Sequence, residues 1–236
     1  MRRARTSTII LAIIVAFSML VAAGCGGSGS GKASKPSSAS TEIRKVTIPK
    51  PDSELDAEVG PETVTTLRSA GCELGTFPDT EGLHVDQGED LKSPQFPPVG
   101  GSHFEDWAPF GRYTEPIDDG FVVHNLEHGG VVAWVGTKVD DATVKAIDGL
   151  LDDGEKWVLA PRTDIEGLYS AAWFTALTCP PKALETLGPK GVASALDDWY
   201  DAVNSTGSKA EKDVPAYAGA MKEPSPKRDI SEPSPF

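Results

Sequence analysis

The chain has 236 residues and a formal net charge of −13 at pH 7. Residues 1–24 contain three arginines and no acidic residue, so the remainder carries −13 − 3 = −16. Such a chain lacks the basic face that binds phosphate backbones, which excludes a nucleic-acid partner. The charge identifies no particular protein or small-molecule partner, and that partner stays unknown at this stage.

Residues 1–24 are typical of an export signal. Arg2, Arg3 and Arg5 precede an almost wholly apolar run over residues 8–23, and small residues lead to a cysteine. The run is shorter than the roughly twenty residues of a membrane-spanning helix. The pattern resembles a bacterial lipoprotein signal peptide, which implies that Cys25 is lipidated and becomes the mature N-terminus. An uncleaved anchor with an incidental cysteine is the alternative, and both place the rest of the chain outside the cytoplasm at a membrane.

Two flanking segments are poor in large apolar side chains. Residues 25–52 are rich in Gly, Ser, Lys and Pro, which predicts a flexible tether. Residues 223–236 contain four prolines and predict a disordered tail. Between them, residues 53–222 are enough for one globular domain of ordinary size.

The elements expected in this domain alternate between helices and strands. We predict a helix over Pro61–Ala70, an irregular Pro/Gly-rich region from residue 72 to 112, and a helix that Asp140 or Asp141 caps and that runs to about Leu151. A final helix is expected over residues 190–203. The predicted strands are residues 121–124, 131–135, 157–160 and 171–177. This order indicates an α+β domain: a mostly antiparallel sheet, flanking helices and a long loop region.

Besides Cys25 the chain contains two cysteines, Cys72 and Cys179. An exported domain with two cysteines most often pairs them. The bridge would close a loop of over a hundred residues and contribute on the order of 3–5 kcal/mol. The alternative makes Cys179 a thiolate metal ligand or a nucleophile.

The central motif is the segment from residue 122 to 132, which contains His124, Glu127 and His128. Residues i, i+3 and i+4 of a helical turn share one face. The three side chains could therefore converge on one point, as two imidazole ligands and an acid would. Because Gly129 and Gly130 follow at once, we expect a single turn between two strands.

All four histidines fall within 45 residues of one another. The irregular region contains His84 and His103. Its prolines stiffen the backbone and its glycines permit tight turns, which can fix the position of a side chain. His103 with His124 and His128 would form a three-imidazole site for zinc or copper. His84 would be a fourth ligand or support a ligand, and Glu127 would ligate, orient an imidazole or act as general base.

Two hypotheses compete with a site that only binds a metal. One is a metal-free, disulfide-stapled binding or scaffold module, in which the histidines form a buried polar network and Trp107, Phe110 and Tyr113 face a partner at the cell surface. The other is a metal-dependent hydrolase with Glu127 as general base. His-x-x-Glu-His matches the inverted zincin signature and the metal motif of S-ribosylhomocysteinase, although both use it on a sustained helix.

Five short motifs occur together in one order. They are Gly71-Cys72, Leu83-His84-Val85, residues 97–103 (PPVGGSH), residues 111–113 (GRY) and residues 124–129 (HNLEHG). With Ala172-Trp173 and Cys179 they resemble a bacterial family of secreted or membrane-anchored proteins, domain of unknown function 3105. The resemblance covers about residues 60 to 180 and implies no established activity.

Overall fold

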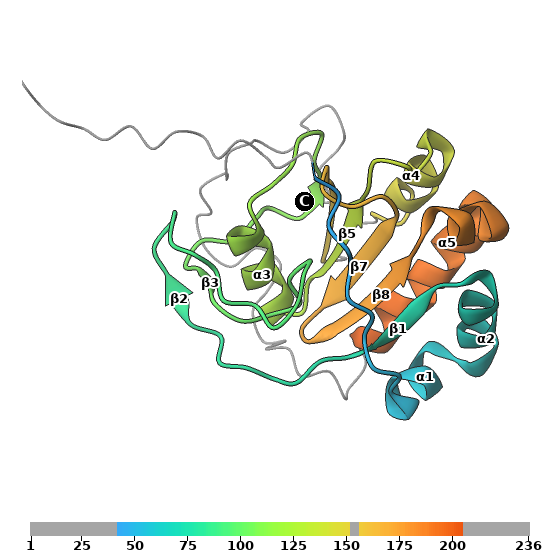
Figure 1. Cartoon of the computed structure of the whole chain (residues 1–236), viewed down its shortest axis with the longest axis horizontal. Coiled ribbons are helices and arrows are strands. Elements are labelled where there is room, and N and C mark those ends of the chain that lie inside the picture. The colour runs from blue at the N-terminus through green and yellow to red at the C-terminus, as the bar shows by residue number, and fades with distance from the viewer. Residues whose placement is uncertain (1–41, 152–155, 205–236) are drawn as a thin grey trace, which may run out of the picture. The chain divides into compact units, whose positions relative to one another are not determined.

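The structure, a computed structural model, describes residues 42–151 and 156–204 (Figure 1). All of them belong to one compact unit, Ala39–Phe236. The signal peptide expected at residues 1–24, lipidation of Cys25, residues 25–41 of the tether and the tail at 223–236 lie outside the described residues. Within residues 42–151 and 156–204, no helix has the length and apolar character to cross a membrane.

A six-stranded sheet forms the centre of the domain. The strand order is β1-β8-β7-β5-β6-β4. The pairs β1–β8, β8–β7 and β7–β5 are antiparallel, whereas β5–β6 and β6–β4 are parallel. The bounds are β1 Glu73–Thr76, β4 Gly111–Arg112, β5 Val131–Val135, β6 Trp157–Pro161, β7 Leu168–Ala172 and β8 Thr175–Cys179. This arrangement confirms the predicted α+β domain with a mostly antiparallel sheet.

The two faces of the sheet carry separate cores. Alternation along β5 sends Val131 and Ala133 to one face and Val132 and Trp134 to the other. The first face packs against four helices (Figure 1), which are α1 Ser53–Val59, α2 Pro61–Ala70, α4 Asp141–Asp148 and α5 Pro181–Val203. The second face packs against helix α3 (Asp119–Glu127) and the long loops around it.

Helix ends follow the capping residues in the sequence. Gly71, with φ 100°, ends α2 at the predicted residue, because glycine adopts the left-handed conformation without steric cost. The Asp140 side chain accepts a hydrogen bond from the backbone N–H of Thr143 and caps α4 as predicted, but the helix ends at Asp148 and not near Leu151. Helix α5 begins earlier than predicted, at Pro181, and has a kink at Gly188 before Pro189. The prediction therefore found only its second half.

The strand predicted at residues 121–124 and the single helical turn expected after it are both wrong, because residues 119–127 form the nine-residue helix α3. The Asp118 side chain accepts a hydrogen bond from Gly120 N–H and caps this helix. Every residue from 120 to 126 is buried. A helix buried on all sides has no polar face, so its apolar run has the pattern of a buried strand.

The prediction for residues 171–177 also needs correction. They form a hairpin in which β7 ends at Ala172 and β8 begins at Thr175. Phe174 makes the turn with φ 54°, and its N–H donates to Val99 O. The tertiary contact with the long loop, which no local pattern reports, fixes the turn.

The metal-free scaffold hypothesis placed Trp107, Phe110 and Tyr113 at the surface, and the structure corrects this placement. Phe110 and Tyr113 are only 3% and 2% exposed, so they belong to the core of the second face and not to the surface. Trp107 is half-buried.

The disulfide Cys72–Cys179 is present and confirms the predicted pairing. It lies beside the β1–β8 pair Glu73 and Thr178. The bridge joins the end of α2 to the start of α5 across 107 residues of sequence.

Candidate metal centre

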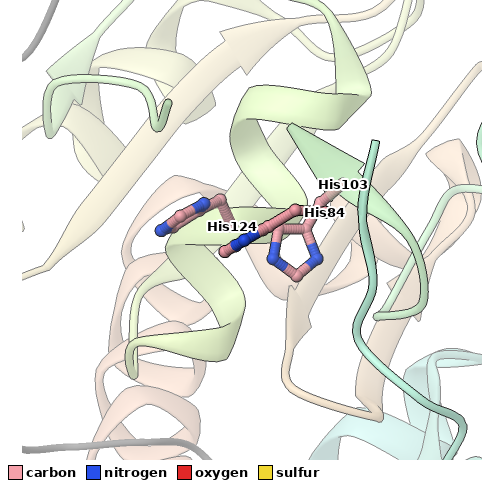
Figure 2. Close-up of side chains that lie close together, drawn as sticks. All are labelled: His84, His103 and His124. Atoms are coloured by element: carbon pink, nitrogen blue, oxygen red, sulfur yellow. The ribbon is translucent and has the colours of Figure 1, made fainter. Parts of the chain in front are cut away.

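Three histidines come together from three chain segments (Figure 2). Strands β2 (His84–Val85) and β3 (His103–Phe104) form a short parallel pair in which His84 lies opposite His103. His103 N–H donates to Leu83 O at 3.0 Å and holds this pair in register. Helix α3 brings His124 to the same place, since α3 packs against β3.

The three imidazoles enclose a small space. One candidate ligand atom from each of His84, His103 and His124 lies within 4.8 Å of the others. The rings of His84 and His124 are stacked at 5.3 Å with an interplanar angle of 6°, and the His103 ring lies across both (Figure 2). His103 and His124 are buried, whereas His84 is exposed. The cluster is therefore open to solvent on the β2 side.

Backbone carbonyls determine which nitrogen of each buried ring is free to bind a metal. His103 Nδ1 lies 2.9 Å from Gly101 O, and His124 Nδ1 lies 2.7 Å from Phe104 O. Because a carbonyl only accepts, each Nδ1 carries the proton, and Nε2 of the neutral ring keeps its lone pair. Histidines that bind metals are commonly held by such a contact.

Glu127 lies beside the cluster. Its Oε2 is 3.1 Å from His103 Nε2 and 4.0 Å from His128 Nε2. Two ligands that hold one tetrahedral ion at about 2.0–2.1 Å are themselves about 3.3 Å apart. The His103–Glu127 pair already has nearly this separation, so one ion could contact both atoms.

This contact changes the acid–base behaviour of both groups. Burial lowers the pKa of His103, but the Glu127 carboxylate and the Gly101 carbonyl outweigh it, and the net pKa is raised. The contact is short without the angles of a hydrogen bond, so we attribute the Glu127 contribution chiefly to its charge. The pKa of Glu127 is lowered, because His103 and His128 outweigh its burial.

The pKa of His124 shifts in the opposite direction from that of His103. Burial lowers its pKa to about 4, and the neighbouring histidines add to the shift. At neutral pH the ring is therefore neutral, which is the form that binds a metal ion.

Two supporting contacts were not recognised in the sequence. Ala108 N–H donates to Asn125 Oδ1 at 3.0 Å, and Asn125 Nδ2 donates to Ala108 O at 2.8 Å. This double contact ties the loop after β3 to the helix that carries His124. A Cβ at Gly82 would lie 2.5 Å from Glu127 Oε1, so a larger residue at this position would displace the Glu127 side chain. No periodic pattern marks either residue.

His128 lies next to the cluster without completing it. It caps the C-terminus of α3, and its ring is 4.8 Å from the His124 ring. The sequence predicted His103, His124 and His128 as the ligands, with His84 in a fourth or supporting position. The structure instead groups His84 with His103 and His124, and metal binding by any of these residues stays a prediction.

One comparison with known proteins gives a match. The family model described as "Protein of unknown function (DUF3105)" matches residues 84–183, which include all four histidines, Glu127 and Cys179. The match confirms the resemblance inferred from the motifs, and its description assigns no activity. No curated protein and no solved structure matches the chain.

Proposed function

We propose that this protein is a membrane-anchored, extracytoplasmic lipoprotein whose domain binds a transition metal, zinc or copper, through His84, His103 and His124. The grouping of three imidazole nitrogens within 4.8 Å carries the proposal. Contacts of two rings with backbone carbonyls support it, because they leave Nε2 of each neutral ring available as a ligand.

Metal binding requires a small closure of the cluster. Two nitrogens that share an ion at about 2.0–2.1 Å cannot be more than about 4.2 Å apart. The exposed His84 side chain rotates inward, since the buried rings of His103 and His124 are held by their carbonyl partners. Glu127 then supplies a fourth ligand beside His103, and His128 supports Glu127 from the other side.

Imidazole-rich sites of this kind suit zinc and copper rather than magnesium or calcium, which prefer oxygen ligands. The Cys72–Cys179 disulfide is consistent with the proposed location outside the cytoplasm. Anchoring through lipidated Cys25 is part of the same proposal.

Equilibrium titration of the full chain with Zn²⁺ and Cu²⁺ tests the proposal. We expect one bound ion in the wild type and an affinity at least about tenfold weaker in His84→Ala and in His124→Gln. Gln87→Ala is the matched control, since Gln87 lies on the same exposed segment as His84. Equal affinities in all four proteins would refute the site.

A metal-dependent hydrolase is the second candidate. Three imidazole ligands leave an open position on zinc, and Glu127 lies 3.1 Å from one of the three rings with a lowered pKa, hence ionised. Hydrolysis of p-nitrophenyl acetate by the zinc-loaded protein is the assay. Under this hypothesis Glu127→Gln abolishes the rate while zinc stays bound, whereas an unchanged rate argues against Glu127 as base.

A further inference from the structure

A cavity of about 270 Å³ is distinct from the histidine cluster, since none of its described lining residues is a histidine. One wall is residues 42–50, which we call the N-terminal strap. Its apolar side chains Ile43, Val46 and Ile48 line the cavity. In Figure 1 the strap is the blue segment that crosses in front of β7 and β8.

Hydrogen bonds hold the strap to the domain at separate points along its length. Arg44 N–H donates to Asp164 O at 2.8 Å, and Gln95 Nε2 donates to Thr47 O at 3.0 Å. Lys50 forms an isolated bridge with Thr76. The cavity between the strap and the sheet is therefore a built feature of the fold.

Opposite the strap, the cavity is lined by one row of polar side chains. Glu73 of β1 pairs with Thr178 of β8, which pairs with Tyr169 of β7, and directly opposed residues share one face of a sheet. All three line the cavity.

One oxygen of this row lacks a hydrogen-bond partner among the described residues: Glu73 Oε2 is buried and accepts no hydrogen bond. The Tyr169 side chain is 0% exposed; burial raises the pKa of its hydroxyl, and a hydrogen bond with Gln95 partly offsets that rise. Buried polar atoms without a partner are uncommon and call for an explanation. Glutamate turns freely about its last torsion, so Oε2 can reach a group placed in the cavity.

The chemistry of the row defines the missing partner. A carboxylate only accepts hydrogen bonds, whereas the hydroxyls of Tyr169 and Thr178 accept as well as donate. A second carboxylate, Glu166, also lines the cavity, but Lys138 Nζ lies 2.7 Å from its Oε1 and balances its charge. The Arg44 guanidinium is part of the lining as well and lies 3.3 Å above the Phe96 ring. Glu73 forms no ion pair among the described residues, so the cavity combines apolar walls with one carboxylate available to a cationic ligand.

We propose that this cavity is a second binding site, independent of the histidines, for a small primary ammonium compound with an apolar tail. The ammonium group donates to Glu73, Thr178 and Tyr169, and the tail packs against Ile43 and Ile48. A volume near the lower end of that of known ligand pockets limits the ligand to a small molecule.

Titration of the full chain with hexylammonium, followed by NMR chemical shifts, tests this proposal against 1-hexanol and hexanoate. Hexylammonium should bind at least about tenfold more tightly than 1-hexanol, the size of effect expected for one charge-assisted hydrogen bond. Hexanoate should bind most weakly of the three. Binding should persist in His124→Gln, which impairs only the metal site.

Glu73→Gln keeps the shape of the side chain and should abolish the preference for the amine. Glu62→Gln, the same charge change at an exposed position in α2, should leave it intact. Ile43→Ser changes a side chain that is 45% exposed, so the fold should tolerate the substitution. It should weaken the binding of hexylammonium and of 1-hexanol to the same extent. Equal affinity for the amine and the alcohol, an unchanged affinity in Glu73→Gln, or no binding of the amine would each overturn the proposal.

Discussion

The tautomers of both buried imidazoles depend on four consecutive residues, 101–104. Gly101 O and Phe104 O accept from the Nδ1 atoms of His103 and His124. Ser102 holds this segment in place, because its N–H donates to Lys92 O and its Oγ accepts from Lys92 N–H. A short segment that ends in β3 thus sets which nitrogen is protonated in two rings that come from different elements.

The depressed pKa of His124 makes the stability of the metal-free protein depend on pH. Folded His124 stays neutral down to about pH 4, whereas in the unfolded chain it binds a proton near pH 6.5. A group with a depressed pKa contributes stability above its unfolded value and loses that contribution as pH falls through its folded value. The free energy of unfolding should therefore fall by about 3 kcal/mol from this group between pH 7 and pH 4.

Urea unfolding of the wild type and of His124→Gln at several pH values checks this. The difference between the two curves isolates His124, because Glu127 and His103 titrate in both proteins. Parallel curves over that pH range would show that His124 ionises as freely in the folded state as in the unfolded chain.

A further prediction for a single residue concerns Asn125. Replacing it by alanine removes both contacts with Ala108 and leaves a buried N–H and a buried C=O without partners. We expect a loss of about 2–4 kcal/mol in the free energy of unfolding. Gln87→Ala, at an exposed side chain, should change it by less than about 0.5 kcal/mol. A small effect of Asn125→Ala would mean that the loop after β3 is held in some other way.

Individual elements differ in how well the sequence predicted them. Helices α2 and α4 have caps and one-sided apolar stripes, so their local signals and their tertiary surroundings agree. Helix α3 has the cap Asp118, but burial of its whole surface removes the stripe, and Val122-Val123 then favours a strand. Tertiary packing decided its structure against the local pattern.

The same contrast applies to the candidate site. The spacing of His124 and Glu127 and the clustering of the histidines identified the region. The place of His84 could not be predicted, because it depends on the two-residue parallel pair β2–β3. A strand of two residues shows no periodicity, and parallel pairing joins segments that no local rule connects.

The packing of α3 on β3 gives a test at the scale of elements. A Cβ at Gly120 would lie 2.4 Å from Cε2 of Phe104, a buried ring that packs edge-on against Phe121. Gly120→Ala should therefore cost about 1–3 kcal/mol in stability. At Gly149 the nearest atom to a Cβ is 3.4 Å away and φ is −66°, so Gly149→Ala should stay within about 1 kcal/mol of the wild type. Equal effects in thermal unfolding would contradict the close packing of α3 on β3.

Strand β2 provides a second test, which rests on the proposed metal site. Residues 78–84 are exposed, and Leu83 is 56% exposed. Drawing His84 inward on metal binding should fix this segment to the rest of the cluster. Hydrogen exchange around residues 78–90 should therefore slow with Zn²⁺ in the wild type and in Gln87→Ala, but not in His84→Ala. Unchanged exchange with zinc bound would show that His84 is not a ligand.

For the molecule as a whole, the disulfide and the metal are expected to stabilise the fold separately. The bridge spans 107 residues, for which loop closure contributes on the order of 3–5 kcal/mol. A reductant, or the double substitution Cys72→Ala and Cys179→Ala, should lower the melting temperature. An unchanged melting temperature would mean that the bridge does not restrict the conformations of the unfolded chain.

Chelation separates the metal proposal from the metal-free scaffold. A bound ion stabilises only the folded state, so removal of zinc or copper should lower the melting temperature further, whether or not the bridge is reduced. Under the metal-free scaffold hypothesis, the reductant lowers the melting temperature and chelation leaves it unchanged.

The most direct test of the central claim is a crystal structure of the zinc-loaded protein, with anomalous diffraction at the zinc edge. We expect one ion with nitrogens of His84, His103 and His124 at about 2.0–2.1 Å, and with a Glu127 oxygen beside it. An ion bound elsewhere, or zinc absent while the three rings keep their present separation, would contradict it.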